Sequence, residues 1–173
     1  MLVLEGENGG TMPNSAGRAD EVVSLDVLGH DGQAYANQEY VVIVDNEYTG
    51  MAALQATGAF IIVTDFDGSL ENGSMSVALV NDTGFVEDVD YDSTNNDGIG
   101  ALDGYTLGTD YEAVGFREQL GDTVYGVDLT IYVGGDPDGQ PDPDIMLRDG
   151  ITGNWEAGEA TDYTATPGAL NDN

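Results

Sequence analysis

The sequence predicts an all-β fold, built as an antiparallel sandwich or barrel of roughly eight to ten short strands. Three observations lead to this prediction. Short apolar segments alternate with polar residues, Asp-Gly and Asn-Gly pairs recur between those segments, and only one stretch has the composition of a helix. Because Asp, Asn and Gly tolerate positive φ, such pairs bend the chain tightly between neighbouring strands.

The expected strands lie along the whole chain. Apolar and polar residues alternate with a period of two in residues 23–27, 75–79 and 127–133, which predicts half-buried strands. Continuous apolar runs at residues 40–44 and 60–63 predict central strands that are covered on both faces. Shorter strands are expected at residues 2–4, 85–89, 111–116, 145–147 and 161–165.

Residues 48–56 are the helical candidate. Their Met51-Ala52-Ala53-Leu54 core consists of good helix formers, and Gly58 is placed to end the helix. We find no clear internal repeat and no linker, so residues 1–173 are expected to form a single domain.

The charge of the chain restricts its partners. Thirty-three Asp and Glu side chains face three Arg and no Lys, a formal net charge of −30. Without a basic patch, binding to nucleic acid or to an anionic membrane surface is not expected. No apolar run is long enough for a membrane-spanning helix, and the absence of Cys excludes disulfides and thiolate metal sites. A saline habitat would also favour an acidic surface, but it would not explain why the carboxylates gather beside Gly and Asn.

Residues 90–98 contain the strongest local signal. Oxygen-bearing side chains recur there and precede Gly98, which permits a sharp reversal of the chain, and such loops wrap hard cations, above all Ca²⁺. The spacing differs from that of an EF-hand loop, and the alternative is a solvated turn rich in Asp and Asn. The predicted calcium ligands in this first cluster are Asp90, Asp92, Asn95, Asp97 and Asp103.

A second acidic cluster occupies residues 136–144. Its carboxylates are spaced so that several can point the same way in an extended chain, and its prolines stiffen that chain. The alternative is a rigid, charged loop at the tip of a hairpin. The predicted metal ligands in this second cluster are Asp136, Asp138, Asp142 and Asp144.

Catalytic constellations are poor, and we do not expect an enzyme. His30 is the one histidine, and the sequence His30-Asp31-Gly32 is typical of an exposed turn. Carboxylate pairs have no diagnostic value in so acidic a chain, and no phosphate-binding or dinucleotide-binding motif is present. Trp155 and the nine Tyr residues are expected to pack in the core, with a carbohydrate-stacking platform as the alternative.

A further set of segments occurs in a fixed order along the chain: residues 65–74, 77–80, 90–98, 111–116 and 122–126, Trp155, and Thr166-Pro167-Gly168-Ala169-Leu170-Asn171. In this order the segments resemble those of bacterial lamin-tail-like domains, and the resemblance covers about residues 60–171. The resemblance implies an immunoglobulin-like β-sandwich in a secreted or surface protein. It also implies that one or two strands that usually precede a segment like residues 2–6 are absent.

A sandwich without a strand would expose apolar core and unpaired edge amides. The sequence therefore suggests a non-catalytic extracellular structural protein, a calcium-stabilised subunit of a surface filament or matrix. Its copies would be joined by strand exchange, with residues 1–20 and 165–173 as the tails that pass between subunits. The alternative is a carbohydrate-binding or adhesive module of a larger surface protein, with a glycan as its partner.

Overall fold

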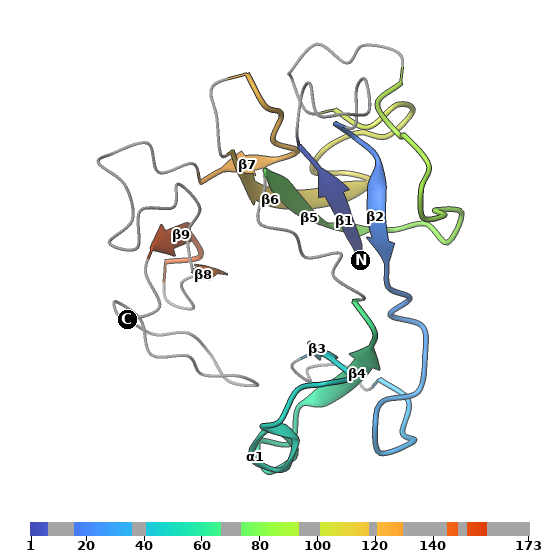
Figure 1. Ribbon diagram of the computed structural model, residues 1–173, viewed down its shortest axis with the longest axis vertical. Helices are drawn as coiled ribbons and strands as arrows, with labels where there is room; N and C mark the ends of the chain where they lie inside the picture. The colour runs from blue at the N-terminus through green and yellow to red at the C-terminus, as the bar shows by residue number, and fades with distance from the viewer. Residues whose placement is uncertain are drawn as a thin grey trace.

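The computed structural model describes residues 1–6, 16–35, 41–66, 74–93, 101–117, 121–129, 145–148 and 152–158. In this part of the chain the fold is all-β, with strands in three sheets and one short helix (Figure 1). The elements are β1 (Leu2–Glu5), β2 (Ala19–Val22), β3 (Val41–Asp45), α1 (Met51–Gln55), β4 (Phe60–Thr64), β5 (Met75–Val80), β6 (Tyr111–Phe116), β7 (Val127–Asp128), β8 (Ile145–Arg148) and β9 (Trp155–Gly158).

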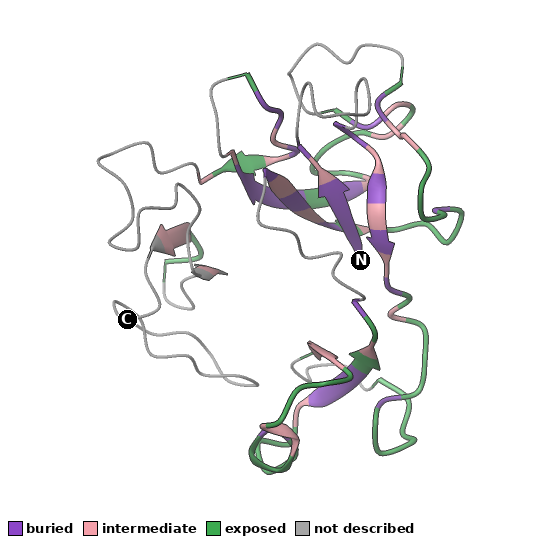
Figure 2. Ribbon diagram, in the orientation of Figure 1, coloured by how far each residue is buried: buried purple, intermediate pink, exposed green. Residues whose placement is uncertain are grey.

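The largest sheet, called the main sheet below, has the strand order β2-β1-β5-β6-β7. All its pairs are antiparallel except β6–β7, which is parallel. Strand β1 lies between β2 and β5 and is buried along nearly its whole length (Figure 2). Both edges of β1 are therefore paired within the described part of the chain, and the absence of one or two preceding strands stays a prediction.

Loops close the core on one face of the main sheet. Leu2, Leu4, Tyr111 and other strand residues pack there against Phe85 and Leu102, which lie in loops. The Phe85 ring also contacts two partly buried rings, with its centroid 4.6 Å from that of Tyr91 and 4.9 Å from that of Tyr105. The all-β prediction is confirmed, and the immunoglobulin-like sandwich stays a prediction.

Strands β3 and β4 form a separate two-stranded sheet, and they run parallel. Helix α1 lies in the connection between them, so the chain can return to the end of the sheet at which β3 began. The sequence predicted both strands and the helix, but the expectation of purely antiparallel pairing was wrong here. Gly58 turns the chain after α1 with φ +78°, and its N–H donates to the Gln55 carbonyl over 3.2 Å.

The burial of β3 and β4 differs from the prediction of two fully covered strands. Phe60, Ile61 and Ile62 of β4 are buried, and Phe60 and Ile62 pack with Val23 and Phe66. Strand β3 is only half-buried, and its Val41 is 39% exposed. Strand β3 lies beside β4 (Figures 1 and 2), and no other described strand pairs with it.

Other strand predictions had mixed outcomes. Residues 75–79 and 111–116 form β5 and β6, and residues 2–4 and 145–147 lie in β1 and β8. Residues 23–27 form no strand, because beyond Val23, whose N–H donates to the Met1 carbonyl over 2.8 Å, they run along no partner strand. Residues 85–89 turn instead of extending, since Asp88 has φ +64°. Of residues 127–133, only Val127–Asp128 form a described strand, and residues 130–133 and 161–165 lie outside the described part.

The described residues of the first predicted tail, the segment 1–20, contribute β1 and the first part of β2 to the chain's own main sheet. The segment 165–173 lies outside the described residues.

Candidate cation-binding loop and open sheet edge

The first acidic cluster begins and ends at two backbone segments that lie side by side. The Asp103 N–H donates to the Tyr91 carbonyl over 2.6 Å, and the Ser93 hydroxyl donates to Asp103 Oδ2 over 3.3 Å. The Asp92 N–H donates to Asp90 Oδ1 over 2.9 Å, which fixes a tight turn. Three predicted ligands, Asp90, Asp92 and Asp103, are thus brought to one neck of the loop.

Within this neck Asp92 points into the protein. It is 1% exposed, and its Oδ2 accepts a hydrogen bond of 2.8 Å from the hydroxyl of the fully buried Tyr125. Burial is the main cause that raises the pKa of Tyr125, and the hydrogen bond to Asp92 raises it further. Gly17 completes the contact, because a Cβ at this position would lie 2.5 Å from the Asp92 Cβ and 2.8 Å from the Tyr125 hydroxyl oxygen. Asp92 therefore anchors the loop to the core.

The remaining predicted metal ligands are not among the described residues. Asn95, Asp97, Asp136, Asp138, Asp142 and Asp144 lie outside the described residues. Among the described residues, no three Asp, Glu or His side chains are grouped so that they could hold one metal ion. Calcium binding by the first cluster therefore stays a prediction.

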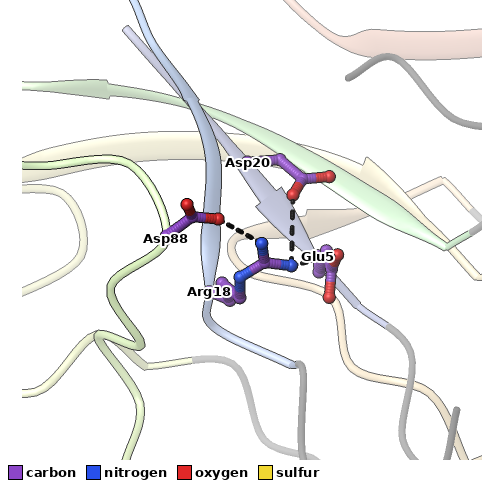
Figure 3. A network of polar contacts seen from close by, with 4 residues as sticks. All are labelled: Glu5, Arg18, Asp20 and Asp88. Atoms are coloured by element: carbon purple, nitrogen blue, oxygen red, sulfur yellow. Dashed lines mark hydrogen bonds and ion pairs between the residues drawn. The ribbon is translucent and has the colours of Figure 1, made fainter. Parts of the chain in front are cut away.

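Arg18 links the loop before the first acidic cluster to the main sheet (Figure 3). Its Nη1 donates to Glu5 Oε1 over 3.0 Å and lies 3.6 Å from Asp20 Oδ1, and its Nη2 donates to Asp88 Oδ1. The hydrogen bond to Asp88 is the largest cause that raises the pKa of the guanidinium. One cation is thus shared by three carboxylates, from β1, β2 and the loop before the acidic cluster. The sequence did not predict this network, because its members are far apart along the chain.

His30 lies in a turn that is hydrogen-bonded to β4. Its side chain is exposed, and its backbone N–H donates to the Ile61 carbonyl over 2.7 Å. This turn therefore lies against β4 and already uses one of the strand's backbone carbonyls as a hydrogen-bond acceptor. The prediction of an exposed turn at His30 is confirmed.

The outer edge of β3 is an open sheet edge in the described part of the chain. No described strand pairs with β3 on the side away from β4. By contrast, the β2 edge is partly covered, since the Ala19 N–H donates to the Val89 carbonyl and the Asp88 N–H to the Ala19 carbonyl. Strand β3 has the sequence Val-Val-Ile-Val-Asp, without the Lys or Pro that commonly blunt an exposed edge.

Comparison with known proteins adds no relative. No family model matches the chain, and neither a curated protein nor a solved structure is similar to it at the threshold of significance. Within the described residues, no helix has the length and apolar character needed to span a membrane.

Proposed function

We propose that this chain is a non-catalytic structural protein of the extracellular space or cell surface, whose copies assemble into a filament or matrix through open sheet edges. The observation that carries the proposal is the outer edge of β3. A half-buried, β-branched strand with no described partner strand on one side offers a template for a strand from another chain. In this proposal the lamin-tail-like resemblance supplies the extracellular setting and the immunoglobulin-like sandwich.

The two faces of β3 have different roles in this account. Ile43 packs toward the cluster of Phe60 and Ile62, so it holds β3 on β4. Val42 and Val44 alternate with Ile43 and point to the other face, beside Ile61 and the 38%-exposed Val63. An added strand would extend both faces of the sheet. The apolar surface that it buries would stabilise the contact by about 25 cal/mol for each Å².

Assembly through a single edge has a geometric limit. Two β3 strands that pair about a twofold axis would join two copies and then close. A filament needs a second, different contact. Candidates for that contact are the segment 165–173 and the outer edges of the two-stranded β8–β9 sheet.

In this proposal, cations control whether the copies assemble. Copies with a formal charge of −30 repel one another, and salt near physiological strength shortens that repulsion to a range of about 8–10 Å. Calcium bound by the acidic clusters would remove charge locally and stiffen the loop whose neck contains Asp90, Asp92 and Asp103. Calcium should therefore promote assembly more strongly than the same ionic strength of sodium chloride.

The test is sedimentation velocity and negative-stain electron microscopy of the full chain in millimolar calcium, in chelator, and in sodium chloride at matched ionic strength. The proposal predicts large assemblies in calcium and small species in chelator. Assemblies of the same size and number in calcium and chelator would overturn the calcium control. A monomer under every condition would overturn the structural role itself.

The alternative, a carbohydrate-binding or adhesive module, depends on exposed Tyr side chains or Trp155 on one flat face beside a calcium loop. Among the described residues, the pocket that Trp155 lines contains one carboxylate side chain, Glu112, and no hydroxyl or amide side chain. A ligand covered in hydroxyl groups needs more hydrogen-bonding partners than this lining offers. The pocket therefore gives the carbohydrate hypothesis little support.

A further inference from the structure

A pocket of about 350 Å³ lies between the β6–β7 side of the main sheet and β9. It differs from the acidic loops because apolar groups dominate its lining. The lining residues are Leu107, Gly108, Glu112, Ala113, Gly126, Val127 and Trp155. Two apolar members, Leu107 and Val127, are 49% and 43% exposed, so the pocket presents apolar surface that solvent reaches.

The backbone around the pocket is held in place. Gly126, at φ +94°, lies against the backbone of Ala113, where a Cβ would collide with the Ala113 carbonyl. The Gly108 N–H donates to the Tyr111 carbonyl over 2.8 Å, and a Cβ at Gly108 would meet no atom within 4 Å. The absence of side chains at these two positions keeps one wall close to β6 and leaves room at the other.

Glu112 supplies the charge of the pocket. Its side chain is exposed, and no hydrogen bond or ion pair joins it to another residue in the described part of the chain. Two of the three arginines are paired with carboxylates, Arg18 with Glu5 and Asp88, and Arg117 with Asp128. The third, Arg148, is the cross-strand partner of Trp155 in the β8–β9 pair. The pocket therefore places a carboxylate beside an indole and aliphatic walls, a lining that suits a cation.

We propose that this pocket binds a small organic ammonium ion, with Trp155 and Glu112 as its principal contacts. An indole attracts a positive charge placed over its face, and alkylated ammonium groups are recognised in this way. Leu107 and Val127 would contact the alkyl groups, and Glu112 would balance the charge. The formal charge of −30 raises the local concentration of any cation, which further favours this ligand class over an anion. This inference does not depend on the proposed assembly.

Trp155 is the single tryptophan of the chain, so its fluorescence reports directly on the pocket. The full chain would be titrated with choline chloride that replaces sodium chloride at constant ionic strength. We expect a saturable change in the emission of Trp155. The neutral isostere of choline, 3,3-dimethylbutan-1-ol, should give a markedly weaker response, and methyl β-glucoside should give none.

The variant Glu112→Gln should weaken choline binding about threefold to fivefold, as expected for the loss of an exposed charge pair. The matched control is Glu87→Gln, which removes the same charge from an exposed loop position outside the pocket lining. Circular dichroism would confirm that both variants fold. The inference would be overturned by a linear response to choline, by an equal response to the neutral isostere, by saturable binding of the glucoside alone, or by equal effects of the two substitutions.

Discussion

The hydroxyl of Tyr125 donates a hydrogen bond of 2.8 Å to the carboxylate of Asp92, and both side chains are almost completely buried. The two residues join the neck of the acidic loop to the core of the main sheet. Because a buried carboxylate without a donor is costly, this contact couples the position of the loop to the stability of the sheet.

Substitution Tyr125→Phe tests this coupling. The variant keeps the ring but removes the donor, so we expect a loss of about 1–3 kcal/mol in the free energy of unfolding. Chemical denaturation monitored by circular dichroism measures the loss. Tyr48→Phe is the control, since Tyr48 is 43% exposed and should change stability little. A loss in the control as large as that of Tyr125→Phe would contradict the assignment.

The same hydroxyl predicts a dependence on alkaline pH. The pKa of Tyr125 is raised above its ordinary value of 10.0 in the folded state, mainly by burial. An unfolded chain loses this proton at about pH 10, whereas the folded chain retains it. The contribution of Tyr125 is therefore fully present below the unfolded pKa and is lost as the pH rises further. Urea denaturation between about pH 8 and about pH 11 should show a shallower decline for Tyr125→Phe than for wild type, and parallel curves would contradict the prediction.

Gly17 tests how closely the chain approaches this pair. Its φ of +91° disfavours any side chain, and a Cβ there would also collide with Asp92 and Tyr125. Gly32 is the matched control, because its φ of +78° carries a similar backbone cost but a Cβ there would meet no atom within 4 Å. In both variants the strained backbone alone should lower the free energy of unfolding by about 1–3 kcal/mol. Thermal denaturation should show that Gly17→Ala is the more destabilising of the two. Equal losses would indicate that the neck can move away.

Arg18 is predicted to act through its charge. In Arg18→Gln, the carboxylates of Glu5, Asp20 and Asp88 would remain close together without a cation, and we expect a loss of about 1–2 kcal/mol, because the pairs are partly exposed. Molar sodium chloride should restore part of that loss by screening. The control Arg18→Lys keeps the charge and should lose less. A loss that is independent of salt would assign the role of Arg18 to packing.

Calcium should raise the melting temperature of the chain relative to chelator, because bound metal stabilises the folded state. Asp103→Asn removes a predicted ligand at the neck of the first cluster and should reduce this increment. Asp26→Asn, a change of an exposed carboxylate outside the acidic clusters, should leave it unchanged. Differential scanning calorimetry measures both. A melting temperature that does not respond to calcium would mean that the acidic loops are solvated turns.

Local sequence patterns predicted much of the fold. The alternation in residues 75–79 and the apolar runs at residues 60–63 correspond to β5 and β4. Strand β2 was missed because its sequence Ala-Asp-Glu-Val has no apolar alternation, and it is held by β1 and by the loop around Asp88. The parallel pairing of β3 and β4 was missed for a related reason, since a pattern indicates a strand but not its partner.

The candidate site was predictable to a similar degree. The sequence placed Asp90, Asp92 and Asp103 in one predicted calcium site; hydrogen bonds at Tyr91 and Ser93 hold the backbone segments around them together, and the site itself stays a prediction. The spacing did not predict that Asp92 would turn inward, because its partner Tyr125 is 33 residues away. The role of Arg18 was hidden in the same way, since its partner Asp88 is 70 residues away.

The most direct test of the account is a charge placed on the open edge of β3. Val44→Lys should block strand addition, as edge lysines do in natural sheets. Leu79→Lys is the matched control, because Leu79 is 54% exposed but lies on β5, which is paired on both sides. Both variants reduce the net negative charge equally. Sedimentation velocity in millimolar calcium should show Val44→Lys as a small species and Leu79→Lys in assemblies like those of wild type. Assemblies of equal size in both variants would contradict assembly through β3.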